Sequence, residues 1–190
     1  MSFLDPTASA EDTEQKPLAE RIDSLDGKRI GLVGNGKQAA EPVLNVVEER
    51  LREQYDDVSI EYYLVEELNM LKDDSVLEDI GEWSADTVDV AITAMGDCGS
   101  CTKFLAWATD SIEANGVPAV GLVEEGFVMD WKSNSIERGR SLRFQVIPVR
   151  CEVTDRDRIR GDITGDVLAD IADELTRPRD EDERELATAD

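Results

Sequence analysis

Met95-Gly96-Asp97-Cys98-Gly99-Ser100-Cys101-Thr102 is the stretch at which the pattern of the chain changes. Residues 88–94 before it (VDVAITA) form an apolar, β-branched run that is typical of a buried strand. Residues 103–108 after it (KFLAWA) favour a helix. The stretch therefore predicts a turn from a strand into a helix, with Cys98 and Cys101 at the start of that helix.

A helix start favours a reactive thiol. The first amides of a helix have no partner within it and carry partial positive charge, so they stabilise a thiolate, which is the reactive form of cysteine. We expect Cys98, at the loop end, to attack a substrate and Cys101, inside the first turn, to resolve the mixed disulfide. The alternative is two buried structural cysteines, but their small and polar neighbours make a poor core.

The other residues of the turn are expected to support this pair. Gly99 and Ser100 stand between the cysteines, and Thr102 follows them. Asp97 either accepts a proton or caps the helix, and the cap is the interpretation that we favour.

Apolar periodicity predicts an alternation of strands and helices along the rest of the chain. The predicted strands span 28–33, 58–64, 88–94, 117–123 and 142–149. The predicted helices span 37–55, 76–83, 103–115, 129–136 and 162–175. Such alternation favours a parallel sheet covered by helices on both faces. We predict a flavodoxin-like three-layer α/β/α sandwich with a mostly parallel five-stranded sheet in the order 2-1-3-4-5.

In such sheets ligands bind beyond the carboxyl ends of the strands, at the point where the strand order reverses. The loops after strands 1 and 3 meet there, which places Gly34-Asn35-Gly36 beside Cys98. Glu124 and Glu125 follow strand 4, and Cys151 follows strand 5, so they also reach this edge. We interpret Cys151 as an incidental thiol, and Trp83, Trp107 and Trp131 as packing residues.

We divide the chain into three parts. Residues 1–25 have little periodicity and are predicted to be a mobile acidic leader. Residues 26–176 form the α/β domain, and residues 177–190 form a charged C-terminal tail without an apolar stripe.

Gly31-Leu32-Val33-Gly34-Asn35-Gly36-Lys37 has the spacing of a phosphate-binding loop. However, Gln38 occupies the position of the magnesium-binding hydroxyl, and Gly31 must lie within a strand. We therefore predict no NTPase. A weaker role is anion binding by Gly34, Asn35, Gly36 and Lys37, and the alternative is a tight turn with a surface lysine.

Metal and cofactor chemistry have little support in the sequence. The chain has 3 cysteines and no histidine, whereas zinc prefers four cysteine or histidine ligands. A site from Cys98, Cys101, Cys151 and a carboxylate is the weak alternative, and two chains could share an ion. The fold is compatible with a flavin, but a fold alone does not imply a cofactor, and we predict none.

Composition limits the partners. The net charge is −24, from 44 acidic and 20 basic residues, which argues against nucleic acid and anionic membranes. An acidic, lysine-poor surface suits the cytosol of a halophile, where salt screens self-repulsion. The chain has no apolar run of spanning length, and its first residues do not resemble a signal peptide, so we expect a cytoplasmic protein.

The motif Cys98-Gly99-Ser100-Cys101 in its strand–turn–helix setting resembles that of the UGSC family of (seleno)proteins, named for a selenocysteine- or cysteine-Gly-Ser-Cys motif. The resemblance covers roughly residues 26–175. The stretches that agree besides the motif are Lys28 to Gly31, Asn35 with Lys37, Pro118 through Phe127, and Ile147-Pro148. Gln38 and Ala39 depart from the Pro and Asn that the family usually has there.

The resemblance implies that Cys98 is the reactive group, because members with selenocysteine carry it at the matching position. It also implies similarity to the selenoprotein subunits of reductase systems. We therefore predict a thiol-based redox protein or reductase subunit that acts on a small-molecule or thiol substrate, with a partner reductase subunit or a homodimer among the assemblies to test. The alternative is a non-catalytic thiol sensor, a metal-binding module or a small-anion-binding module.

Overall fold

The computed structural model describes residues 14–150 and 152–188 of the chain. It contains a five-stranded sheet in the order β2-β1-β3-β4-β5, in which every pairing is parallel. The strands are β1 (Arg29–Gly34), β2 (Ser59–Leu64), β3 (Val90–Gly96), β4 (Ala119–Glu124) and β5 (Phe144–Ile147). The flavodoxin-like fold and the predicted strand order are confirmed.

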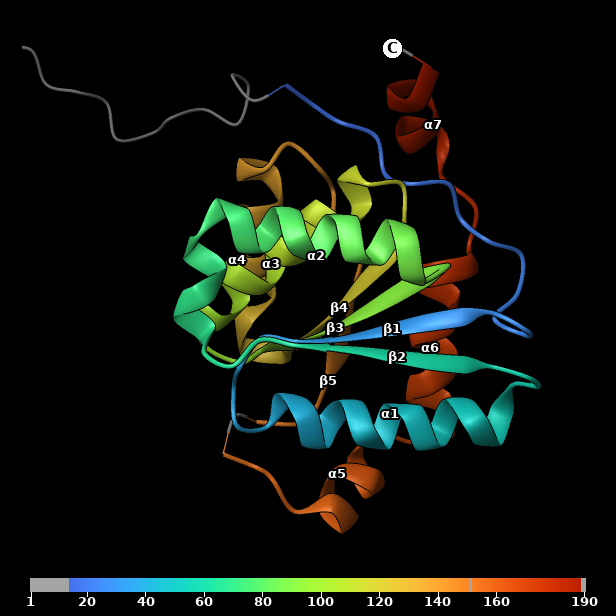
Figure 1. Cartoon of the computed structure of the whole chain (residues 1–190), viewed down its shortest axis with the longest axis vertical. Helices are drawn as coiled ribbons and strands as arrows, with labels where there is room; N and C mark the ends of the chain where they lie inside the picture. The colour runs from blue at the N-terminus through green and yellow to red at the C-terminus, as the bar shows by residue number, and fades with distance from the viewer. Residues whose placement is uncertain (1–13, 151, 189–190) are drawn as a thin grey trace, which may run out of the picture.

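Helices cover both faces of the sheet (Figure 1). The α-helices are α1 (Ala40–Gln54), α2 (Asp74–Thr87), α3 (Gly99–Ala114), α4 (Val128–Glu137), α5 (Arg156–Asp162), α6 (Gly165–Thr176) and α7 (Glu181–Thr188). The short 3₁₀ helices are η2 (Leu68–Lys72) and η3 (Glu125–Phe127). Helices α1, α5 and α6 pack on one face, and α2, α3 and α4 pack on the other.

The central strand β3 is buried along its whole length, because both of its faces are covered. Val90 and Ile92 join the core beneath α1 and α6, whereas Ala91 joins the core beneath α2 and α3. Strand residues alternate between the faces, so an unbroken apolar run is what two covered faces require. This rigid strand carries the chain to Cys98.

The predicted helices and strands are present, with ends shifted by a few residues. Residues 156–161 were not predicted to be helical, but they belong to α5. The sequence missed them because their one buried apolar side chain, Ile159, gives no periodic signal. Strand β5 is shorter than the predicted 142–149. Leu142 and Val149 are nevertheless buried, so they contribute to packing rather than to the sheet.

The tryptophans pack as expected. Trp131 of α4 is fully buried and lies against Gly121 of β4, where an added Cβ would stand 2.1 Å from the Trp131 ring. Its Nε1 donates to the Leu142 carbonyl oxygen at 3.0 Å. Trp83 and Trp107 are partly buried against the core under α2 and α3.

The N-terminal part of the chain differs from the prediction. Residues 1–13 of the predicted leader lie outside the described residues, but residues 14–25 pack on the domain. Leu18 is buried among residues of α3 and α4, and Leu25 lies in the core beneath α1. These apolar residues were missed because an extended segment without a helix or strand has no periodicity.

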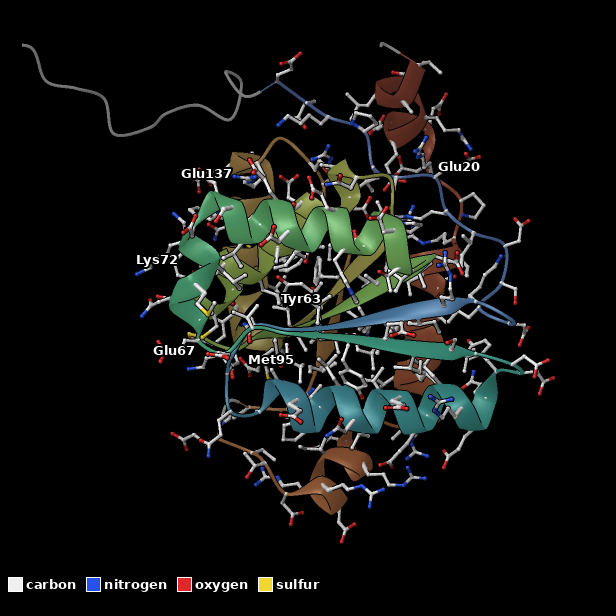
Figure 2. The ribbon with its side chains drawn as sticks, viewed as in Figure 1. Glu20, Tyr63, Glu67, Lys72, Met95 and Glu137 are labelled. Atoms are coloured by element: carbon white, nitrogen blue, oxygen red, sulfur yellow. A yellow bond between two sulfur atoms is a disulfide. The ribbon has the colours of Figure 1, made fainter. Side chains whose placement is uncertain are left out.

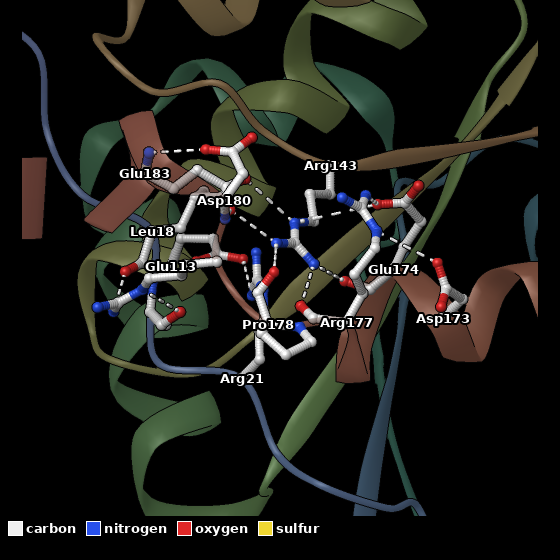
Figure 3. Close-up of polar contacts among 12 residues, drawn as sticks. Leu18, Arg21, Glu113, Arg143, Asp173, Glu174, Arg177, Pro178, Asp180 and Glu183 are labelled. Carbon is white, nitrogen blue, oxygen red and sulfur yellow. Dashed lines mark hydrogen bonds and ion pairs between the residues drawn. The ribbon is translucent and has the colours of Figure 1, made fainter. Parts of the chain in front are cut away.

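A network of arginines and carboxylates holds this segment and the C-terminal tail on the domain (Figure 3). Glu113, near the end of α3, is buried and accepts hydrogen bonds from Ala19 N, Ala119 N and Arg21 Nη1, each at 2.7 Å. Arg143 donates to the carbonyl oxygens of Glu174, Arg177 and Pro178 at 2.7–3.2 Å.

The same Arg143 also donates to Glu183 of α7 at 2.8 Å. Burial alone raises the pKa of Glu183, but the hydrogen bonds from Arg143 and from the Asp180 N–H outweigh it, so the pKa is lowered. The described part of the predicted tail, residues 177–188, contains helix α7, and the ion pair between Arg143 and Glu183 holds this helix on the domain. None of the helices in the described part of the chain has the length and apolarity needed to cross a bilayer.

Candidate functional site

The two cysteines lie at the strand-to-helix turn that the sequence predicts. Strand β3 ends at Gly96 and helix α3 begins at Gly99. Cys98 has extended backbone angles and is the N-cap residue, and its Sγ accepts a hydrogen bond from the Cys101 N–H at 3.1 Å. The prediction that Asp97 caps the helix is therefore wrong. The sulfur of Cys98 takes the place that a cap oxygen usually has.

Cys98 and Cys101 form a disulfide, with their Cα atoms 5.0 Å apart. Cys98 is partly exposed, whereas Cys101 is fully buried in the first turn of α3. This difference in exposure agrees with the expectation that Cys98 is the more accessible of the two. Cys98 is therefore the member of the pair with contact to solvent, and Cys101 lies behind it in the disulfide.

Thr102 and Gly96 hold the turn in shape. The buried Thr102 donates from its Oγ1 to the Cys98 carbonyl oxygen at 2.8 Å, and its backbone N–H donates to the same oxygen at 2.9 Å. Thr102 lies so close to Gly96 that a Cβ added to Gly96 would stand 3.0 Å from Thr102 Oγ1. The predicted supporting role of Thr102 is thus a structural one, which holds the carbonyl of Cys98.

Gly99 and Ser100 are exposed between the cysteines. A Cβ added to Gly99 would find a single neighbour within 4 Å, Asp130 Oδ1 at 3.9 Å. Gly99 therefore does not fill a crowded position, and this side of the disulfide is open. The Asp130 carboxylate of α4 faces it.

The loop after β1 lies beside the end of β3, as predicted. Asn35 is buried and donates from Nδ2 to the Met95 carbonyl oxygen at 2.8 Å, and its backbone N–H donates to the Ala94 carbonyl oxygen at 2.9 Å. Figure 2 labels Met95 at this edge of the sheet. Through Asn35 the loop after β1 supports the strand end that carries the cysteines.

The same loop does not have the geometry of a phosphate cradle. Helix α1 begins at Ala40, so Lys37 precedes the helix, and its N–H donates to Asn35 Oδ1 at 3.3 Å. Gly36 has a φ of +75° and packs on the backbone of Glu67. The cavity of about 290 Å³ at this loop is lined by Glu41 and Glu66 as well as Lys37, and two carboxylates beside one lysine do not favour an anion.

A second cavity is lined by Asp97, the residue before Cys98. It has a volume of about 420 Å³ and is lined by Asp97, Glu124, Phe127, Arg150 and Glu152. Glu124 reaches this edge as predicted, and its Oε2 accepts from Gly126 N at 3.0 Å. Glu125 is exposed. The sequence reasoning missed Phe127, Arg150 and Glu152, although the position of 150–152 after the last strand is a signal that could have found two of them.

A sequence model of the UGSC family matches residues 2–177. The match covers most of the chain and includes the Cys98-Gly99-Ser100-Cys101 motif. The chain belongs to the UGSC family. No curated protein and no solved structure matches it. The UGSC match begins at residue 2, so it includes residues 14–25, which the structure packs on the domain.

One group of side chains in the described part of this UGSC protein could hold a metal ion. Among residues 14–150 and 152–188, Asp97, Cys98 and Cys101 place one ligand atom each within 4.8 Å of one another. This is a three-ligand set of two sulfurs and one carboxylate, whereas structural zinc takes four ligands. The remaining cysteine, Cys151, lies outside the described residues.

Proposed function

We propose that this UGSC protein is a thiol-based redox protein in which Cys98 attacks a substrate and Cys101 resolves the mixed disulfide. The observation that carries the proposal is the contact between the Cys98 sulfur and the Cys101 N–H at the first turn of a 16-residue helix. An amide that donates to sulfur at a helix start stabilises the thiolate that attacks. Cys101 then attacks the Cys98 sulfur of the mixed disulfide, and the substrate leaves as its thiolate.

The proposed thiol–disulfide chemistry needs a reducing compartment and an electron donor that regenerates the two thiols. A cytoplasmic location suits a pair that cycles, because glutathione and thioredoxin systems keep thiols reduced there. A partner reductase subunit or a small thiol would reduce the Cys98–Cys101 disulfide. The acidic surface supports a role that involves neither nucleic acid nor membrane, and it supports a halophilic host.

We expect the cysteines of the reduced protein to alkylate at unequal rates. Cys98 should react with iodoacetamide at neutral pH about tenfold faster than Cys101, because it is partly exposed, Cys101 is buried, and the Cys98 thiolate is stabilised. Timed alkylation with peptide mass spectrometry measures both rates. Mild oxidant should remove two hydrogens from the pair, and dithiothreitol should restore them. Slow labelling of both cysteines at one common rate would contradict the proposal and leave two structural cysteines.

The second candidate is a metal-binding module, and the cluster of Asp97, Cys98 and Cys101 ligand atoms within 4.8 Å favours it. A variant of the first proposal is a sensor, in which the Cys98–Cys101 pair is oxidised and reduced but catalyses no reaction of a substrate.

We expect the purified reduced protein to hold no stoichiometric zinc, because three donors leave the preferred coordination incomplete. Elemental analysis after gel filtration in the presence of a competing chelator measures this. One zinc retained per chain or per dimer would favour the metal class. Its loss on Cys151→Ser would then identify the fourth ligand.

A further inference from the structure

Asp97 connects the reactive pair to a neighbouring cavity. The Asp97 carboxylate and the sulfurs of Cys98 and Cys101 lie within 4.8 Å of one another. Asp97 also lines the cavity of about 420 Å³, a volume that suits a small molecule. Cys98 is the partly exposed member of the pair and directly follows Asp97 in the chain, so the cavity lies on the side of the pair that Asp97 occupies.

The charges of the cavity are unequal. Asp97, Glu124 and Glu152 bring three carboxylates, and Arg150 brings one cation. On the open side of Gly99, the Asp130 carboxylate adds to the negative field. An anionic group in the cavity would meet several like charges at short range, whereas an ammonium group would meet opposite charges.

Phe127 gives a second, independent argument for a cation. Phe127 lines the same cavity, and it packs against the core that contains Leu105, Val123 and Trp131. An aromatic face attracts ammonium groups through its quadrupole, and the attraction grows where water is partly excluded. Carboxylates around an aromatic ring are a chemistry that recognises an alkylammonium.

We propose that the substrate of Cys98 is a small disulfide that carries an ammonium group, and that Glu124, Glu152 and Phe127 hold this group. The inference rests on the proposed function and names its substrate class. In the first step the Cys98 thiolate attacks one sulfur of the aminoalkyl disulfide. The substrate S–S bond breaks, and one aminothiol leaves as a thiolate that takes a proton from water.

In the second step the Cys101 thiolate attacks the Cys98 sulfur of the mixed disulfide. The second aminothiol leaves, and the Cys98–Cys101 disulfide forms. Overall the dithiol of the protein loses two electrons and two protons, and the substrate disulfide gains them to give two thiols. Added dithiothreitol returns the protein to the dithiol.

Three symmetrical disulfides of similar size test the inference: cystamine, which is dicationic, 2-hydroxyethyl disulfide, which is neutral, and 3,3′-dithiodipropionic acid, which is dianionic. Each is mixed with the reduced full-length protein, and formation of the Cys98–Cys101 disulfide is followed by intact mass. Each rate is divided by the rate of the same disulfide with free cysteine, which removes intrinsic reactivity. We expect cystamine to exceed dithiodipropionate by at least about tenfold in this corrected rate.

Charge-neutral variants locate the effect. Glu124→Gln and Glu152→Gln should each lower the corrected ratio of cystamine to dithiodipropionate by about three- to fivefold. The matched control is Asp170→Asn, because Asp170 is an exposed acid of α6 on the opposite face of the sheet. It removes the same charge and should leave the ratio unchanged. Repeating the series in 1 M salt screens the general field of the acidic protein, and the preference should persist.

The outcomes separate the two proposals. Equal corrected rates for the three disulfides, or an equal loss of preference in Asp170→Asn, would overturn the ammonium inference and leave thiol–disulfide exchange in place. If none of the three disulfides oxidises the reduced pair, the proposed function fails, and the inference that rests on it fails as well.

Discussion

A Cys101→Ser variant should accumulate a mixed disulfide at Cys98, and a Cys98→Ser variant should accumulate none. In the first variant the attacking sulfur is partly exposed and keeps the helix start behind it, but no thiol is left to resolve the adduct. In the second variant the remaining sulfur is fully buried. We expect adduct occupancy to differ by at least about an order of magnitude.

The measurement uses both variants in a Cys151→Ser background, so that one thiol remains in each. The reduced proteins are exposed to 2-hydroxyethyl disulfide, quenched with acid and analysed by intact mass. The control is the protein with both Cys98 and Cys101, which should lose two hydrogens and carry no adduct, since Cys101 resolves it. If Cys101→Ser gathers no adduct from this probe or from low-molecular-weight disulfides of a cell extract, the exchange mechanism is wrong and only the fold stands.

The largest loss of stability is expected for Glu113→Ala. Glu113 is buried and accepts from two backbone amides and from Arg21, whose side chain is also buried. Its removal leaves two amides and a guanidinium without their acceptor, and loss of one partner of a buried ion pair costs roughly 3–5 kcal/mol. Residues 14–25 should then detach more readily from the domain, since this side chain joins Ala19 and Arg21 to α3.

Urea unfolding gives the loss in free energy, and limited proteolysis near residue 20 reports the detachment. The matched control is Glu137→Ala, because Glu137 is an exposed acid whose contact with Lys103 spans 3.8 Å, and exposed pairs of this kind contribute on the order of 0–1 kcal/mol. An equal loss for both variants would show that the buried pair adds nothing beyond a surface charge. A loss of stability without faster proteolysis would show that the segment is held by its apolar residues.

The arrangement of the elements could be predicted from the sequence because it rests on local patterns. The apolar run before Cys98 and the helical spacing in residues 37–55 are signals whose residues lie within a few positions of one another. The predicted strand order places the loops after strands 1 and 3 side by side. The structure confirms this, because Asn35 donates to the Met95 carbonyl oxygen at the end of β3. The family motif lies within one such local signal.

The sequence alone could not predict contacts between segments that are far apart in the chain. The sequence predicted Asp97 as the cap of α3, but the N-cap residue is Cys98. Which of the two residues caps the helix depends on the path of the backbone between β3 and α3. Residues 14–25 were predicted to belong to a mobile leader. The structure packs them on the domain, in part through a buried ion pair between Arg21 and Glu113. Such a pair leaves no trace in local periodicity, since its partners are 92 residues apart.

The sequence by itself determined the sheet, its strand order and the position of the two cysteines, because hydrophobic spacing and turn residues act over short distances. Only the tertiary structure decided which atom caps the helix and which side chains surround the pair. Glu124, Phe127 and Glu152 line one cavity with Asp97 because parallel strands and their loops end at the same edge of the sheet. Side chains from separate loops become neighbours there only when long-range packing has set the sheet and its helices in place.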